Sequence, residues 1–162
     1  MILINMKISL FFVGKTSFDY LEKGISEYEK RIKRYVDFEI KTVKDIKAGK
    51  NMPAKIVKQK EGEQVLKQLK NSDYLILLDE KGKQFSSREF AKFIDNKTVT
   101  GTKQLVFLIG GAFGFSEAVY KRANEKLSLS KMTFSHQPVR LLFTEQLYRA
   151  FTIIKGEPYH ND

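Results

Sequence analysis

Residues 104–126, QLVFLIGGAFGFSEAVYKRANEK, decide the fold. They begin with an uninterrupted apolar run, which is typical of a strand buried on both faces of a sheet. Three glycines follow the run, Gly110, Gly111 and Gly114, and Ser116 is placed to cap a helix over EAVYKRANEK at 117–126. A buried strand, a glycine turn and a capped helix in this order predict an α/β fold with a parallel sheet.

The same alternation continues on both sides of this stretch. Before it, DYLILLD at 73–79 predicts a second buried strand, and Ser86 with Glu89 fits the capping box of a helix. After it, LSLSKM at 127–132 predicts a short strand or an extended loop, and VRLLFTEQLYRAFTII at 139–154 predicts a closing helix.

The N-terminal part repeats the pattern. KISLFFV at 7–13 predicts a buried strand, and apolar residues then recur every three or four positions over 18–35, as on one face of a helix. FEIKTV at 38–43 alternates like a half-exposed strand, and a basic helix with Ile56 on its inner face is expected after Pro53. We therefore expect a Rossmann-like parallel sheet with helices on both faces.

The composition fits a single globular domain over residues 1–162, because 42% hydrophobic residues are too many for a disordered chain. The absence of cysteine excludes a disulfide framework, thiol catalysis and a cysteine-ligated metal, and it suits a cytoplasmic protein. The apolar start lacks the basic region and cleavage site of a signal peptide and is too short to span a membrane. Met6 is an alternative start, which would make residues 1–5 a start-site extension.

The chain carries a large positive charge. It has 29 Lys and Arg against 19 Asp and Glu, a net charge of +10, and residues 41–70 hold nine lysines against three acids. Two interpretations stay open: a solvated lysine face that keeps the protein soluble, or a surface that binds nucleic-acid phosphates. We favour the second, because a balanced charge would serve solubility nearly as well.

Three loops are the places to search for a ligand, because open α/β sheets bind ligands outside the carboxyl ends of their strands. These loops are residues 78–83, 109–116 and 127–134. Their small residues let a ligand approach the backbone closely, although tight turns without a ligand would use the same residues. No GxGxxG or GxxxxGK[ST] motif occurs, so a dinucleotide site is not expected and a P-loop is excluded. Together the three loops could form one cofactor cleft.

Adjacent carboxylates stand in the first loop. Asp79 and Glu80 could serve as general acid and base or hold a metal. Neighbouring carboxylates in a turn are more often solvated, and no histidine lies near them in the sequence. We therefore expect no metal site.

The closing helix is apolar over a wide arc. Its apolar residues are Leu141, Leu142, Phe143, Leu147, Tyr148, Phe151, Ile153 and Ile154. This arc fits either a deeply buried helix or a homodimer seam that also touches the core, and both interpretations stay open.

Both histidines flank this helix, His136 before it and His160 after it. A lone histidine is more often a hydrogen-bonded structural residue than a catalyst. His160, however, follows Pro158 and Tyr159 beyond a helix stop at Gly156, where the pattern assigns it no core role. Its position indicates a tail ordered against a ligand or a partner subunit.

Several motifs together resemble a known family. They are KEGEQVL, LLDEKGK, FLIGGAFGFS and LSLSKMTFSHQPVRLLFTEQLYRAFTIIKGEPYH. From Met6 to His160 the chain closely resembles the RlmH family, small bacterial methyltransferases of the SPOUT class that act on a pseudouridine of large-subunit ribosomal RNA. The order of motifs in the last third is highly specific.

The resemblance implies a homodimer and a C-terminal trefoil knot that forms the pocket for S-adenosylmethionine. The knot follows from the resemblance alone, since chains as a rule do not thread loops. Carried over residue by residue, the resemblance implies a cofactor pocket made of Leu78, Gly110, Leu129, Ser130, Lys131, Met132, Thr133 and Phe134.

The resemblance also implies methylation of N3 of a pseudouridine in 23S ribosomal RNA. An imide proton must leave N3, and His160 is the expected acceptor because imidazole titrates near the working pH. Tyr159 would stack on or hydrogen-bond the flipped base. His136 and Arg140 would order the tail or touch RNA, including from the other subunit. Residues 156–162 would then be an active-site tail completed by dimerisation.

One departure from the family keeps an alternative open. Members of the family commonly carry Lys or Arg directly after P-Y-H, whereas this chain has Asn161 and Asp162. A non-catalytic module of the same fold that binds RNA or ribosomes would fit this departure. A small-molecule methyltransferase would leave the lysines of residues 41–70 without a role. We expect 23S ribosomal RNA within the assembled ribosome as the partner, with no membrane and no metal.

Overall fold

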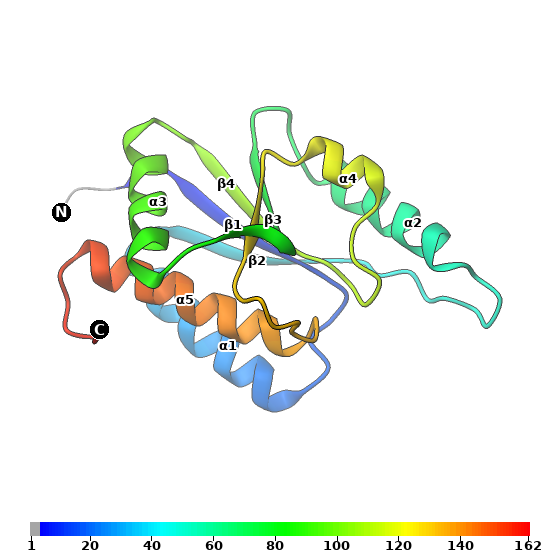
Figure 1. Ribbon diagram of the computed structural model, residues 1–162, viewed down its shortest axis with the longest axis horizontal. Helices are drawn as coiled ribbons and strands as arrows, with labels where there is room; N and C mark the ends of the chain where they lie inside the picture. Colours follow the sequence, from blue (N-terminus) through cyan, green and yellow to red (C-terminus); the bar gives the residue numbers. More distant parts are fainter. Residues whose placement is uncertain (1–3) are drawn as a thin grey trace.

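A five-stranded parallel sheet forms the centre of the molecule in the computed structural model, which describes residues 4–162 (Figure 1). The strands lie in the order β2-β1-β4-β3-β5, and every neighbouring pair is parallel, which confirms the predicted α/β class. Their bounds are β1 Lys7–Val13, β2 Asp37–Val43, β3 Tyr74–Gln84, β4 Gln104–Ile109 and β5 Glu125–Ser128. Most of the suggested start-site extension, residues 1–3, lies outside the described residues.

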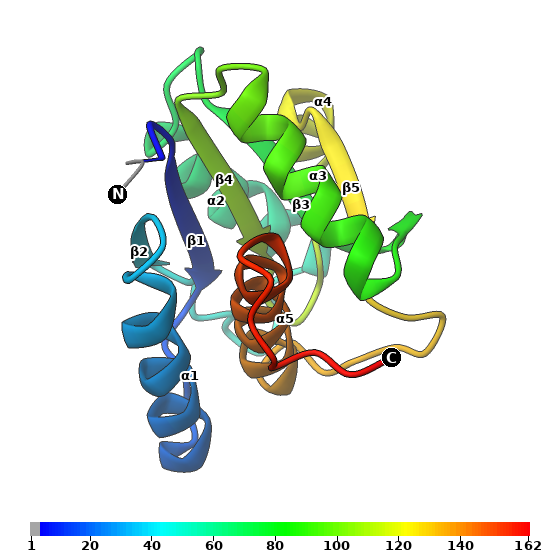
Figure 2. The same cartoon turned by 90° about the vertical axis from the view of Figure 1, so that its left-hand side faces the viewer.

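Five helices cover the two faces of the sheet. They are α1 Asp19–Ile32, α2 Ala54–Lys67, α3 Ser87–Val99, α4 Glu117–Arg122 and α5 Pro138–Ile154. On one face α5 packs against both α1 and α3, while α2 and α4 pack together on the other face (Figure 2). Over residues 4–162, no helix has the length and apolar character needed to cross a bilayer.

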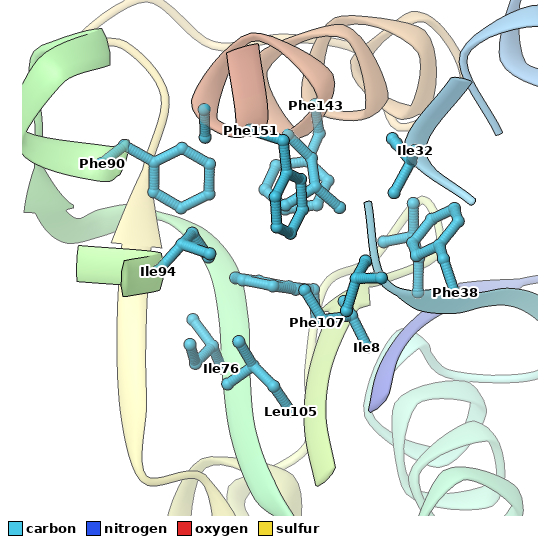
Figure 3. Packing of buried hydrophobic residues seen from close by; sticks show 14 of the residues in the cluster. Ile8, Ile32, Phe38, Ile76, Phe90, Ile94, Leu105, Phe107, Phe143 and Phe151 are labelled. Atoms are coloured by element: carbon cyan, nitrogen blue, oxygen red, sulfur yellow. The ribbon is translucent and has the colours of Figure 1, made fainter. Parts of the chain in front are cut away.

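Both faces of the central strands are apolar, which explains their uninterrupted hydrophobic runs. In β4, Leu105 and Phe107 face α1, α3 and α5, whereas Val106 and Leu108 face α2 and α4. On the first face the ring centroid of Phe107 lies 4.8 Å from that of Phe143 in α5 (Figure 3). The closing helix is therefore a core element.

The two helix starts predicted from serine caps agree with the structure. Ser86 accepts a hydrogen bond from the N–H of Glu89 and completes the predicted capping box, and Ser116 caps α4. The helix after Ser116 ends at Arg122, earlier than expected, because the chain turns into β5 and the N–H of Asn124 bonds the carbonyl of Leu75. Ile56, expected on the inner face of α2, is 37% exposed, since Val57 takes the inner position.

β3 continues past its apolar run through residues 78–83, which were expected to form a loop, and there it crosses β5 at very short range. Leu127 of β5 pairs with Leu78 and again with Lys83, so the ladder shifts register between these two positions. A Cβ placed on Gly82 would lie 2.5 Å from the backbone N of Leu127. The trefoil knot and the dimer stay predictions.

Candidate functional site

A cavity of about 340 Å³ opens where the apolar run of β3 ends and beside the carboxyl ends of β4 and β5. Its walls come from the three segments that sequence reasoning selected, and seven of the eight predicted cofactor residues line it: Leu78, Gly110, Leu129, Ser130, Met132, Thr133 and Phe134. The eighth, Lys131, is exposed and does not line the cavity. The parallel strands thus bring together predicted cofactor residues that are up to 56 positions apart, from 78 to 134.

The glycine turn after β4 forms one wall and requires glycine at two positions. Gly114 has a φ of +81°, in the left-handed region that residues with a side chain rarely adopt. A Cβ on Gly110 would lie 2.9 Å from the ring of Phe115. The turn therefore depends on these glycines whether or not it contacts a ligand.

The wall after β5 is stiffened by its own hydroxyl groups. Ser128 donates a hydrogen bond to the carbonyl of Ser130 at 2.9 Å, and the N–H of Met132 donates to Oγ of Ser130 at 3.0 Å. The hydroxyl of Thr133 donates to a carboxylate oxygen of Glu80 at 2.9 Å, which ties this wall to the second half of β3. These bonds leave the side chain of Met132 exposed at the rim.

Sequence reasoning considered Asp79 and Glu80 but favoured a solvated turn for them, and it missed Tyr120. Asp79, Glu80 and Tyr120 all line the cavity, and the Tyr120 hydroxyl donates a hydrogen bond to Asp79. Burial, together with the nearby Asp79 carboxylate, raises the pKa of Tyr120 to about 12. The two carboxylates are therefore hydrogen-bond acceptors of the cavity wall. Among residues 4–162 no group of His, Cys, Asp and Glu is arranged to hold a metal ion.

His136 also lines the cavity, beside the residues expected to hold the cofactor. Burial lowers its pKa below the ordinary value, and the positive charge of Arg140 adds to the effect. The imidazole of His136 is therefore uncharged at neutral pH.

Arg140 does not lie where a residue that touches RNA would. Its side chain is fully buried and donates hydrogen bonds to the carbonyls of Val13 and Gly14 at 2.8 and 3.0 Å. It also bonds the Thr16 hydroxyl at 3.1 Å, and the guanidinium carbon lies 4.7 Å from the centre of the Phe12 ring. This corrects the expectation for Arg140: it fixes the end of β1 instead of contacting RNA or the tail.

The tail that carries Tyr159 and His160 lies against α5 and away from the cavity of its own chain. The Tyr159 hydroxyl donates to Glu145 at 3.0 Å. Nδ1 of His160 lies 3.1 Å from a guanidinium nitrogen of Arg149, and its Nε2 lies 2.8 Å from a carboxylate oxygen of Asp162. The structure therefore brings Tyr159 and His160 together but separates them from the predicted cofactor residues.

A second cavity of about 370 Å³ lies between the first cavity and the tail. It shares Leu127, Ser128, Leu129 and Phe134 with the first cavity and reaches Glu145, the partner of Tyr159. Leu142 of α5 lines it and is 43% exposed, whereas most of the helix's apolar arc is packed in the core. The arc is thus mainly that of a buried helix, with an apolar remainder next to the site.

Comparison with known proteins agrees with these features. A family model described as "Predicted SPOUT methyltransferase" matches residues 6–160. The chain is similar to proteins named ribosomal RNA large subunit methyltransferase H. That of Parabacteroides distasonis is 54% identical over 97% of this chain and 100% of the relative. That of Christiangramia forsetii is 55% identical over 96% and 99%, and that of Cytophaga hutchinsonii is 51% identical over 96% and 100%. This chain therefore belongs to the SPOUT methyltransferase family.

Proposed function

We propose that this chain transfers the methyl group of S-adenosylmethionine to N3 of a pseudouridine in 23S ribosomal RNA on the assembled ribosome, in the cytoplasm. The observation that carries the proposal is the convergence of three sequence-distant segments on one cavity at the carboxyl edge of the sheet. The relatives' names, which refer to ribosomal RNA of the large subunit, support the class of substrate.

The residues of the cavity fit S-adenosylmethionine. A volume of about 340 Å³ is in the range of small-ligand sites, and apolar side chains such as Leu78, Leu129 and Phe134 can enclose an adenine ring. The sulfonium supplies an electrophilic methyl group and carries a positive charge. Asp79 and Glu80 in the wall and an uncharged His136 suit a cationic ligand. Lys131 keeps its proposed role only as a residue at the rim.

The proposed chemistry needs an acceptor for the imide proton of N3, and His160 is our candidate. Arg149 donates to Nδ1, so the proton of the neutral ring sits on Nε2 and is donated to Asp162. In this arrangement neither ring nitrogen is free to accept a proton. His160 must therefore exchange one of these partners for the substrate base when the reaction complex forms.

A second copy of the chain would complete the site. Tyr159 and His160 do not line the cavity of their own chain, while apolar Leu142 and Phe134 are exposed between the cavity and the tail. We propose that the homodimer brings the tail of one subunit to the cofactor cavity of the other. His136, which already lines the cavity, would then face the partner's tail.

A non-catalytic RNA-binding module stays the second candidate function. Its support is the tail sequence, where Asn161 and Asp162 follow His160 in place of a basic residue. The guanidinium of Arg88 in α3 lies 2.8 Å from Asp162, so a positive charge is nevertheless present beside the end of the tail. We therefore favour the enzyme.

The deciding experiment mixes the purified chain with labelled S-adenosylmethionine and ribosomes that lack the modification, and maps any methyl group by mass spectrometry. Methyl on N3 of a pseudouridine is the expected result. Cofactor binding without transfer would favour the non-catalytic module. Transfer to naked RNA but not to ribosomes would overturn the assembled particle as substrate.

The affinity for S-adenosylmethionine is expected to fall as the pH drops below the lowered pKa of His136. The cationic sulfonium binds better to the form with neutral His136, so protonation of this residue at low pH opposes binding. Isothermal titration between about pH 5 and 8 measures the effect. The control is His136→Gln, which cannot take up the proton. An equal loss of affinity at low pH in this variant would show that His136 is not the cause.

A further inference from the structure

The fold divides the lysine-rich stretch of residues 41–70 into two parts. β2 ends at Val43 on the same edge of the sheet as the cofactor cavity, and the following loop extends away from the sheet (Figure 1). α2 then runs back, so that Lys67 and Lys70 lie near the opposite edge, where β3 begins at Tyr74. We call residues 44–60 the lysine arm; its lysines are Lys44, Lys47, Lys50, Lys55, Lys58 and Lys60.

The lysines of the arm have no carboxylate partners. All are exposed except Lys58, which is half-buried, and none forms an ion pair within 4.0 Å in the described chain. On α1, by contrast, Arg31 pairs with Glu27, and Lys33 just after the helix pairs with Glu29. A lysine face kept only for solubility needs no such separation of charge.

The acids in and beside the arm do not neutralise it. The arm's single carboxylate is that of Asp45, next to the arm's first lysine. The next acid along the chain, Glu61, is buried and faces the glycine turn, since a Cβ on Gly111 would lie 3.1 Å from its Oε2. Burial also raises the pKa of Glu61, so this carboxyl group ionises less readily than an exposed one. The arm therefore presents mainly positive charge to solvent.

The arm also abuts the cofactor cavity. Lys58 and Gly114 line the same small hollow, and Gly114 belongs to the turn that forms one cavity wall. A Cβ on Gly62 would lie 2.5 Å from Oγ of Ser116, so α2 packs tightly against the start of α4. A polyanion bound along the arm would therefore pass beside the entrance of the cavity.

We propose that the lysine arm is the surface that binds the phosphate backbone of the substrate RNA next to the methylated base. The proposal rests on the ribosomal RNA substrate proposed above. Lysines are point charges that bind phosphates without reading sequence, so the arm would fix the position of the RNA rather than select the base. The lysines at the opposite edge would contribute little.

The test compares two triple variants with the same net charge. Lys44, Lys47 and Lys50 are replaced by Gln in the arm variant, and Lys67, Lys70 and Lys103, all exposed, are replaced by Gln in the control. Binding to large ribosomal subunits is measured between about 50 and 200 mM KCl, and removing three phosphate contacts should reduce the slope of log K against log[salt] by about 2–3. In methyl-transfer assays the arm variant should raise KM for the particle with little change in kcat.

The outcomes separate this inference from the proposed function. An arm-dependent salt slope supports the inference even if no methyl group is transferred, because binding alone is measured. Equal slopes for the arm variant and the wild type would overturn it, even if the chain proves to be a methyltransferase. Binding to vesicles of anionic lipid is measured for comparison. If the arm variant bound such vesicles more weakly but bound ribosomes as well as the wild type does, the inference would also be overturned. S-Adenosylmethionine affinity should be the same in both variants, which confirms that the cavity is intact.

Discussion

Replacing His160 by alanine is expected to lower the rate of methyl transfer by about 10²–10⁴-fold, with S-adenosylmethionine binding kept, as for the loss of a general base. The cavity proposed for the cofactor is lined by other residues, so removing this imidazole leaves its walls unchanged. Single-turnover methyl transfer on ribosomes and isothermal titration with the cofactor measure the two quantities. Full activity of the variant would remove His160 from the mechanism.

The matched control is Asn161→Ala. Asn161 is the exposed neighbour of His160 and lies between it and Asp162. Its replacement keeps the contacts of the imidazole with Arg149 and Asp162 and should leave the rate nearly unchanged. A loss as large as that of His160→Ala would point to a general disturbance of the tail.

A mixing experiment decides whether His160 acts in the cavity of its own chain or of a partner. Leu129→Arg puts a positive charge into the cavity and should abolish cofactor binding. The tail of this variant stays intact. If the tail serves the partner's cavity, mixed dimers of His160→Ala and Leu129→Arg contain one complete site. Random exchange of subunits would then restore about a quarter of the wild-type activity. If subunit exchange is confirmed but activity does not recover, the tail and the cavity of one active site belong to the same chain.

The layers of the fold could be predicted because the signals are local. The apolar run that ends at Ile109 is continuous since β4 is buried on both faces, and serine caps mark the starts of α3 and α4. The strand order and the position of α5 between α1 and α3 depend on contacts between distant segments, which no local pattern reports. The predicted end of α4 was wrong for this reason, because the hydrogen bonds between Asn124 and Leu75 that end the helix join residues 49 positions apart.

The site shows the same division. The three segments could be found because parallel strands must end at a common edge, and the family motifs then named the lining residues. The role that the resemblance implied for Arg140 was wrong, because its side chain is fully buried. Its partners Val13 and Gly14 precede it by 127 and 126 positions, and only the folded chain brings their carbonyls to it. Tyr120 was missed in the same way, since its hydrogen bond to Asp79 joins α4 to β3.

The second large effect is expected for Gly82→Ala, which should reduce the free energy of unfolding by about 3 kcal/mol or more. A Cβ at this position would lie 2.5 Å from the N of Leu127 and 2.6 Å from the carbonyl carbon of Lys126. Both are backbone atoms of β5, so no side-chain rotation can relieve the overlap. Urea unfolding followed by circular dichroism measures the loss.

Gly82 illustrates why a glycine in a turn-like motif cannot be interpreted from sequence alone. The motif LDEKGK is typical of a turn in which glycine supplies a positive φ. The residues with positive φ in the described chain are Gly14, Gly101, Gly114 and Gly156, and Gly82 is not among them. Its small size is needed because β5 passes directly beside it.

Gly49→Ala provides the control for this prediction. Gly49 lies in the loop before α2, and a Cβ there would meet no atom within 4 Å, so its replacement should change stability by less than about 0.5 kcal/mol. If Gly82→Ala and Gly49→Ala unfolded at the same urea concentration, β3 and β5 would not lie as close together at Gly82 as the structure has them. Because Leu78 and Leu127 line the cavity on either side of this crossing, the folded fraction of Gly82→Ala should also bind S-adenosylmethionine more weakly. A lower cofactor affinity in Gly82→Ala, but not in Gly49→Ala, would therefore connect the crossing to the proposed activity.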